Sequence, residues 1–204
     1  KDTEHLVLPR KDELEEVPCP ACASENSDVA FTKYGLTYSE CLDCRSLYLN
    51  PRMPEPMMEE IYSQMESVLY WETHFYKETA EVRREKMFAP RAEQVIAVAK
   101  QYGDADHAQE RIIDVGCGYG VFLDEIKKRN FFTDVVGIEP VASLAAVTRE
   151  KNIEVIEQWV TPATVATIEK KASVLTCFEV LEHVFDPKQF LITFSELLLP
   201  GGLF

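Results

Sequence analysis

Short apolar runs alternate with longer amphipathic stretches from residue 85 to the end of the chain. The apolar runs cover residues 112–115, 135–138, 153–157 and 174–177, and their length and β-branched content are typical of buried strands. Helical spacing of apolar positions predicts helices near residues 85–102, 121–129, 142–151, 164–171 and 187–198. Strands that alternate with helices predict an α/β fold with a doubly wound parallel sheet.

The first half of the chain has a different pattern. Residues 1–17 are rich in charge and are expected to form a flexible tail. Residues 28–41 alternate like a β-hairpin that turns near Tyr34 and Gly35. A proline-rich joint at residues 50–56 precedes roughly helical spacing over residues 57–76. We therefore divide the chain into a tail (1–17), a small module (18–50), a helical linker (51–108) and a core (109–204).

The most informative run is IIDVGCGYG at residues 112–120. It predicts a buried strand followed by a turn and then by the start of an apolar helix. An aspartate precedes the turn, and every second residue of the turn is glycine. Alternate glycines allow a sharp bend and let a ligand lie against the main chain. This setting marks a nucleotide-type cofactor site at the carboxyl end of a parallel sheet. The dinucleotide fingerprint G-x-G-x-x-G does not fit, because Val121 stands where its third glycine is required.

The pattern D-x-G-x-G-x-G resembles the S-adenosylmethionine loop of class I methyltransferases. Residues 174–184, VLTCFEVLEHV, closely resemble the fourth-strand motif of small-molecule methyltransferases, including the ubiquinone-biosynthesis O-methyltransferases. Glu139 ends the second apolar run, where a carboxylate can accept hydrogen bonds from both ribose hydroxyls of an adenosine. The resemblance covers roughly residues 85–204. It implies a Rossmann-like methyltransferase fold with that family's strand order and S-adenosylmethionine as the cofactor.

The resemblance also implies roles for single residues. It assigns cofactor binding to Asp114, Gly116, Gly118, Gly120, Glu139, Trp159 and Phe178. Asp114 would reach the cofactor amine and Glu139 the ribose hydroxyls, while Phe178 lies where the fourth strand opens towards the methyl group. Trp159 and its neighbour Gln158 are candidates for the adenine. Many relatives have an aspartate near that point and this chain does not. For Trp159, ordinary core packing is the alternative.

A hydroxyl acceptor would also need a general base. His183 is the best placed candidate, with Glu179 or Glu182 able to orient it. We therefore name His183 and Glu179 as catalytic candidates. The alternative for His183 is a turn or packing role, which is common for a histidine just past a strand.

Four cysteines have metal-ligand spacing. Cys19 and Cys22 form one C-x2-C pair, Cys41 and Cys44 form a second, and eighteen residues lie between the pairs. This predicts a zinc ribbon with a structural zinc ion, since the protein would supply all four ligands and leave no open position for water. The alternative is four unrelated or redox-active thiols. Cys117 and Cys177, which we place in the glycine loop and in the fourth strand, are expected to be packing residues.

Composition and charge limit the classes of molecule that the protein is expected to bind. The 204 residues are 46% hydrophobic, enough for a real core, and the net charge of −14 disfavours a nucleic-acid substrate. No apolar run approaches the roughly 20 residues needed to cross a bilayer, and the first residues lack a signal-peptide pattern. We expect a cytoplasmic protein. A four-cysteine ribbon ahead of such a core resembles zinc-bearing methyltransferases of bacterial sugar and polysaccharide biosynthesis, which implies a small-molecule or sugar-type acceptor.

The linker is unusually aromatic: Tyr62, Tyr70, Trp71, His74, Phe75 and Tyr76. It would form an aromatic lid over the acceptor or an amphipathic helix that packs on the sheet. Residues 199–204 look like a turn and the start of a fifth strand. Without further strands the fourth strand would present an unpaired apolar edge, so we expect a trimmed chain or a naturally longer protein. Two alternatives to a small-molecule enzyme are a zinc-stabilised non-catalytic scaffold with a degenerate methyltransferase-like domain, and RNA or protein methylation guided by the ribbon, which the acidic charge opposes.

Overall fold

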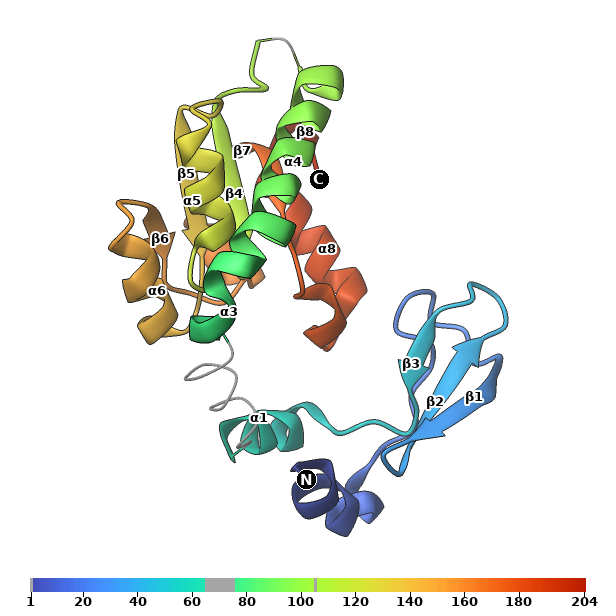
Figure 1. Cartoon of the computed structure of the whole chain (residues 1–204). Coiled ribbons are helices and arrows are strands. Elements are labelled where there is room, and N and C mark those ends of the chain that lie inside the picture. Colours follow the sequence, from blue (N-terminus) through green and yellow to red (C-terminus); the bar gives the residue numbers. More distant parts are fainter. Residues whose placement is uncertain (1, 65–75, 105) are drawn as a thin grey trace. The chain divides into compact units, whose positions relative to one another are not determined.

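The computed structural model describes residues 2–64, 76–104 and 106–204. It divides the chain into two compact units, Lys1–Glu78 and Thr79–Phe204 (Figure 1).

The second unit is built on a five-stranded sheet in the order β6-β5-β4-β7-β8, in which every neighbouring pair is parallel. Its strands are β4 (Arg111–Val115), β5 (Asp134–Ile138), β6 (Glu154–Ile156), β7 (Ala172–Thr176) and β8 (Leu198–Leu203). The chain runs outward from β4 to β6 and then returns to β7 on the other side of β4, which creates a switch point between β4 and β7. The predicted α/β fold and its implied strand order are confirmed.

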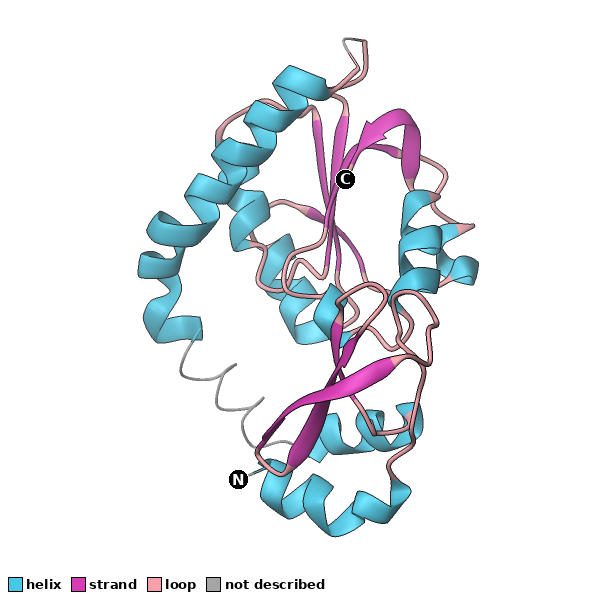
Figure 2. Cartoon of the chain, turned by 90° about the vertical axis from the view of Figure 1, so that its right-hand side faces the viewer, coloured by secondary structure: helices cyan, strands magenta, loops and turns pink. Residues whose placement is uncertain are grey.

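Helices cover both faces of this sheet (Figure 2). The helical segments from Tyr76 onward are α3 (Tyr76–Arg83), η4 (Arg84–Phe88), α4 (Ala89–Tyr102), α5 (Val121–Lys128), α6 (Ala142–Arg149), α7 (Pro162–Val165), η5 (Leu181–His183) and α8 (Pro187–Ser195). Successive side chains of a strand point to opposite faces of the sheet. Ile112 therefore packs with α4, α5 and α6, whereas Ile113 packs with α7 and α8. The result is three layers with a dry sheet at the centre.

Three elements differ from the prediction. The helix expected near residues 164–171 is α7 alone, because Pro162 begins it and a capping box between Thr161 and Thr164 fixes its start earlier in the chain. Strand β7 ends at Thr176, so Cys177 lies just past the strand and not in it. The expected unpaired edge of the fourth strand is wrong: β7 pairs with β4 on one side and with β8 on the other, since residues 198–203 already form the fifth strand.

The first unit contains an antiparallel sheet of β1 (Ser27–Lys33), β2 (Leu36–Cys41) and β3 (Leu47–Leu49). Tyr34 and Gly35 both have positive φ, which matches a two-residue hairpin turn of the kind that follows strand twist. Where the sequence predicts a flexible tail, the structure has η1 (Thr3–Val7) and η2 (Leu8–Glu13). Val7 is buried there against Met57 and Ile61, which α1 (Glu55–Gln64) carries. A few apolar side chains in a charged segment, Val7 with the partly buried Leu6 and Leu14, therefore anchor it.

The predicted aromatic lid lies largely outside the described residues. This holds for Tyr70, Trp71, His74 and Phe75, and for the side chains of Tyr62 and Tyr76. Within the described ranges, no helix combines the length and the apolar character that crossing a membrane requires.

Candidate functional site

The glycine loop joins β4 to α5 at the carboxyl edge of the sheet. Gly118 has a φ of +52°, and a Cβ built there would meet nothing within 4 Å, so open space lies above its backbone. Gly116 also has positive φ, but a Cβ on it would collide with the side chain of Val180. The segment after β7 therefore packs directly on the loop at Gly116, while Gly118 leaves room for a ligand.

Glu139 stands at the end of β5, beside the loop. Its side chain is buried, and its two carboxylate oxygens accept hydrogen bonds from the backbone N–H groups of Gly118 and Val141, each at 2.9 Å. An ionised carboxylate can accept about four hydrogen bonds. Glu139 thus fixes the loop and retains capacity to accept from two ligand hydroxyls.

Asp114 is buried within β4 and accepts a 2.7 Å hydrogen bond from Thr176 Oγ1 on the neighbouring strand β7. Burial raises the pKa of this carboxyl to about 7, although the Thr176 hydrogen bond and the charge of Arg91 act in the opposite direction. A cationic group that approached Asp114 would favour its ionised form. The cofactor amine assigned to Asp114 has that charge.

Thr148 is a site residue that no pattern in the sequence singles out. It is fully buried on α6, and its hydroxyl donates a 2.8 Å hydrogen bond to the carbonyl oxygen of Gly118. Thr148 and Glu139 therefore both hold Gly118: Thr148 bonds to its backbone C=O, and Glu139 bonds to its backbone N–H. Such a helix position carries no local signal, because the contact depends on how α6 packs beside the loop.

Arg91, in the first turn of α4, is the second residue that sequence reasoning missed. Its Nη2 donates a 2.7 Å hydrogen bond to Glu179, and its guanidinium carbon lies 4.9 Å from the centre of the Phe178 ring. Its Nη1 is buried and has no hydrogen-bond partner among the described residues. Arg91 lines a cavity of about 290 Å³ between α4, β7 and β8, together with Gln94, Val95, Val98, Val174, Leu175, Thr176, Cys177, Phe178, Leu203 and Phe204. A cation with a free donor at a cavity is suited to an anionic ligand group.

The remaining predicted residues lie in two settings. Phe178 is half-buried, meets Phe122 edge-to-face at 5.0 Å and lies beside Arg91, so it belongs to the rim of the site. Glu179, whose side chain is 64% exposed, is paired with Arg91. His183 is exposed in η5, and Trp159, after β6, is 72% exposed. The structure therefore brings together Asp114, the glycine loop, Glu139 and Phe178, and it leaves Trp159 and His183 at the surface.

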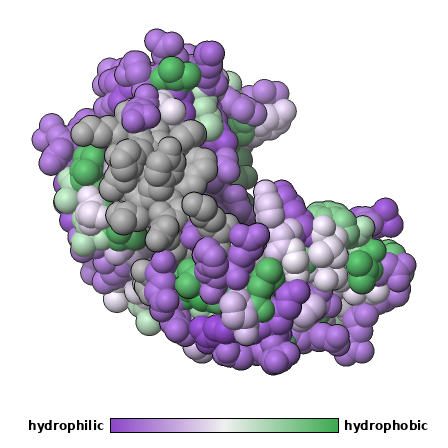
Figure 3. All heavy atoms as spheres, turned by 60° about the horizontal axis from the view of Figure 1, so that its bottom comes forward, coloured by the Kyte–Doolittle hydropathy of each residue, from purple (hydrophilic) through white to green (hydrophobic). Residues whose placement is uncertain are grey.

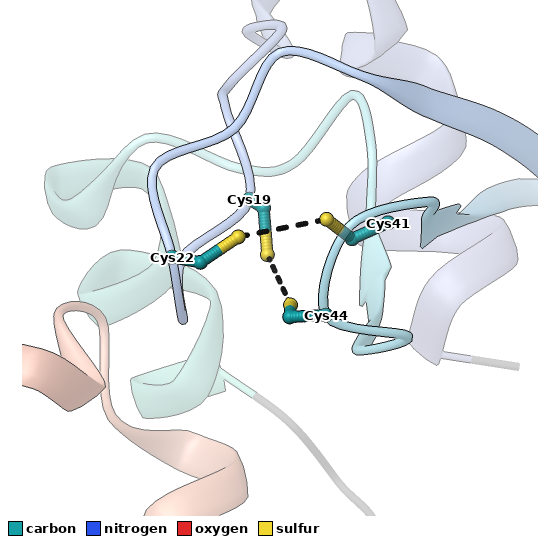
Figure 4. Close-up of side chains that lie close together, drawn as sticks. All are labelled: Cys19, Cys22, Cys41 and Cys44. Atoms are coloured by element: carbon teal, nitrogen blue, oxygen red, sulfur yellow. Dashed lines mark hydrogen bonds between the residues drawn. The ribbon is translucent and has the colours of Figure 1, made fainter.

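The four cysteines of the ribbon converge (Figure 4). Their Sγ atoms all lie within 4.8 Å of one another, with 3.5 Å between Cys19 and Cys44 and 3.6 Å between Cys22 and Cys41. Tetrahedral zinc with Zn–S bonds near 2.3 Å requires sulfur atoms about 3.8 Å apart, so the cluster has the right size for the ion. Hydrogen bonding with Ser46 lowers the pKa of Cys44 to about 6, whereas hydrogen bonds with the neighbouring thiols raise the pKa of Cys22 to about 12, so the closely packed thiols share charge and do not ionise independently. The cluster is compatible with a structural zinc site.

The two other cysteines have the surroundings of packing residues. Cys117, within the glycine loop, is buried with its Sγ against Gly137, and Cys177 is half-buried past β7. Burial raises the pKa of both thiols, that of Cys177 to about 12, so both remain neutral at ordinary pH.

Known proteins resemble this chain. Residues 81–204 match the family model described as "Methyltransferase domain". The ubiquinone biosynthesis O-methyltransferase of Acinetobacter baumannii (strain AYE) is 33% identical over 101 residues, which are 47% of this chain and 42% of that protein. Its counterpart in Saccharophagus degradans is 32% identical over 104 residues, 48% of this chain and 43% of that protein. The match thus takes in less than half the length of these curated relatives.

Two solved structures share the fold. The sugar N-methyltransferase KedS8 from Streptoalloteichus sp ATCC 53650 has a TM-score of 0.52 at 19% identity, over 62% of this chain and 51% of that one. The plantazolicin methyltransferase BpumL in complex with SAH has a TM-score of 0.50 at 18% identity, over 70% of this chain and 58% of that one. The family match includes the glycine loop, Glu139 and the segment after β7, and it extends over more than half of the chain. The protein therefore belongs to the methyltransferase-domain family.

Proposed function

We propose that the protein transfers the methyl group of S-adenosylmethionine to a small-molecule or sugar-type acceptor, with a structural zinc ion in its ribbon. The observation that carries this proposal is the cradle of Gly118 and Glu139. Open space lies over the glycine backbone, and the buried carboxylate beside it keeps capacity for two more hydrogen bonds. This arrangement suits a ribose with both hydroxyls free.

The other binding residues follow from their charge and position. Asp114 would hold the cofactor amine, and the free Nη1 of Arg91 would hold the carboxylate at the same end of the cofactor. Phe178 would line the methyl group's side of the site. Trp159, exposed beyond β6, would cover the adenine from the surface, where a bound base would bury part of the indole. Gly116 and Gly120 would shape the turn.

For methyl transfer, the protein mainly has to align the acceptor with the methyl group and exclude water. Bound S-adenosylmethionine supplies a methyl group on a sulfonium that leaves as a neutral thioether. His183 would accept the proton of a hydroxyl acceptor as its oxygen takes the methyl group, an effect of about 10²–10⁴-fold in rate for a positioned base. Its exposure in η5 leaves it accessible to an acceptor that arrives from solvent. Glu179 would act through its ion pair with Arg91.

The acceptor class rests on separate support. Curated relatives at 32–33% identity are O-methyltransferases of ubiquinone biosynthesis, which supports a small molecule. The ribbon ahead of the core favours a sugar intermediate, as in the methyltransferases that the sequence resembles. The acidic net charge of −14 opposes nucleic acid, and we propose a cytoplasmic location.

Calorimetry with S-adenosylhomocysteine on the full chain tests the cofactor site. The wild type is expected to bind at micromolar concentration. Glu139→Ala should weaken binding at least about 100-fold, because two hydrogen bonds to a charged group are lost, while circular dichroism shows an unchanged fold. Glu169→Ala, an exposed glutamate away from the loop, is the matched control and should bind normally. Undiminished affinity in Glu139→Ala would show that the site is misplaced, and no binding by the wild type would favour the scaffold alternative.

A further inference from the structure

Glu179 has an unusual backbone for a glutamate. Its φ is +57°, in the left-handed region that residues with a Cβ rarely adopt. In this conformation its carboxylate forms the 2.7 Å ion pair with Arg91 Nη2. Strain of this kind persists where surrounding structure enforces it, and it concentrates at functional sites. The side chain is 64% exposed, so burial of an apolar surface does not explain why the strained conformation is kept.

Arg91 is constrained from two sides by consecutive residues. The Phe178 ring lies beneath the guanidinium at 4.9 Å, and Glu179 holds Nη2. A guanidinium is a rigid planar fork, so fixing its plane and one nitrogen fixes the direction of the other nitrogen. That other nitrogen, Nη1, is buried without a partner among the described residues. The contacts thus orient a donor and leave it unsatisfied.

The charge of Arg91 also reaches the cofactor site. It lowers the pKa of Asp114 against the stronger effect of burial, so the two groups lie close enough to interact. A ligand with an amine for Asp114 and a carboxylate for Arg91 would satisfy both residues with one α-amino acid group. This step rests on the proposed function, which supplies the ligand with that end.

We propose that Glu179 is a positioning residue. Its ion pair, supported by the Phe178 ring, aims Arg91 Nη1 at the carboxylate of the cofactor's amino-acid end. The segment after β7, which also packs on the glycine loop through Val180, thereby couples the acceptor side of the site to cofactor recognition. In this role Glu179 does not need to transfer a proton.

The test compares two ligands on the full chain by calorimetry. S-adenosylhomocysteine carries the amino-acid end, whereas 5′-methylthioadenosine has the same adenosyl thioether without it. Arg91→Met should weaken binding of S-adenosylhomocysteine by about 10- to 100-fold, the usual effect of losing a hydrogen bond to a charged group. Glu179→Ala should weaken it by roughly 10-fold, because Arg91 remains but loses its orientation. Neither change should alter the affinity for 5′-methylthioadenosine.

Two further variants separate positioning from a structural role. Glu179→Gln keeps an oxygen that can accept from Nη2 and should recover most of the affinity for S-adenosylhomocysteine. Glu179→Gly relieves the strained backbone, so the melting temperature should rise while the affinity for S-adenosylhomocysteine falls. A purely structural residue would move both quantities in the same direction.

Three results would overturn the proposal. If Glu179→Ala tightens the binding of S-adenosylhomocysteine, Glu179 competes with the cofactor carboxylate for Arg91. If it weakens both ligands equally, Glu179 only maintains the fold. If the wild type binds 5′-methylthioadenosine as tightly as S-adenosylhomocysteine, the adenosyl site exists and Arg91 receives no carboxylate, whereas failure to bind either ligand would reject the proposed function itself.

Discussion

The two units of this chain reach a defined structure by different means. In the unit Thr79–Phe204, two apolar clusters lie on opposite faces of the sheet, with strands β4 and β7 buried along their whole length. In the ribbon, β1 is exposed at every position after Ser27, and the buried cluster contains only Cys19, Cys41 and Tyr48. Figure 3 shows apolar surface among the polar residues of the ribbon, where Val29, Phe31 and Leu47 are exposed.

The difference shows which residues stabilise each unit. A sheet covered by helices is specified by many interchangeable apolar residues, each of which contributes a little. A ribbon of about thirty residues buries little surface to offset its chain entropy, so we expect the proposed metal ligands to supply the missing free energy. The comparison therefore predicts opposite sensitivities in the two units.

Loss of the proposed zinc site should have the largest effect. Structural zinc contributes on the order of 10–16 kcal/mol apparent in small fingers, so the Cys22→Ser, Cys41→Ser double variant should unfold the ribbon. Hydrogen exchange followed by mass spectrometry should show lost protection over residues 18–50 and retained protection in β4, β5 and β7. Elemental analysis should find about one zinc per chain in the wild type and in Cys177→Ser, the control cysteine outside the cluster. A folded ribbon without metal would contradict this expectation.

Substitution of a single apolar residue should destabilise the second unit more than the ribbon. Leu175→Ala, at a buried position of β7, should lower the free energy of unfolding by about 2–5 kcal/mol. Val29→Ala, on β1 where the side chain is 69% exposed, should change stability by less than about 0.5 kcal/mol. Urea denaturation with separate probes in each unit measures both. A large loss from Val29→Ala would mean that the ribbon relies on apolar contacts more than its exposure indicates.

The smallest expected effect is a dependence on pH that belongs to the second unit alone. The pKa of Asp114 is raised by burial from about 3.8 to about 7 in the free protein. Its contribution to stability is therefore fully present below about pH 4 and is lost as pH rises towards 7, because the folded state binds the proton more tightly than the unfolded state. Binding of a cationic amine requires the ionised form of the Asp114 carboxyl.

The affinity for S-adenosylhomocysteine should consequently rise between pH 6 and pH 8, by at most about 10-fold per pH unit below the pKa. Calorimetry in buffers of different ionisation enthalpy should detect proton release at pH 6. Asp114→Asn should bind more weakly and abolish the pH dependence, while exchange protection of β1 and β2 stays the same. A flat pH profile in the wild type would show that Asp114 does not meet the amine.

Local patterns determined much of this protein. Apolar runs of strand length, separated by helical spacing, determined the parallel α/β order, since burial follows the period of each element. The turn IIDVGCGYG and the acid that ends the next strand located Gly118 and Glu139, because both depend on a fixed position at a strand end. The spacing of the two C-x2-C pairs anticipated that their sulfur atoms converge.

Tertiary structure decided the contacts that join distant segments. Only packing reveals that Thr148 on α6 holds the carbonyl of Gly118, that Thr176 on β7 meets Asp114 on β4, and that Arg91 from the helix before the sheet faces Glu179. Each of these residues is ordinary in its own element. A sequence records which side chains an element carries, whereas the partner of a side chain depends on which elements the fold places beside it, and that choice belongs to the whole chain.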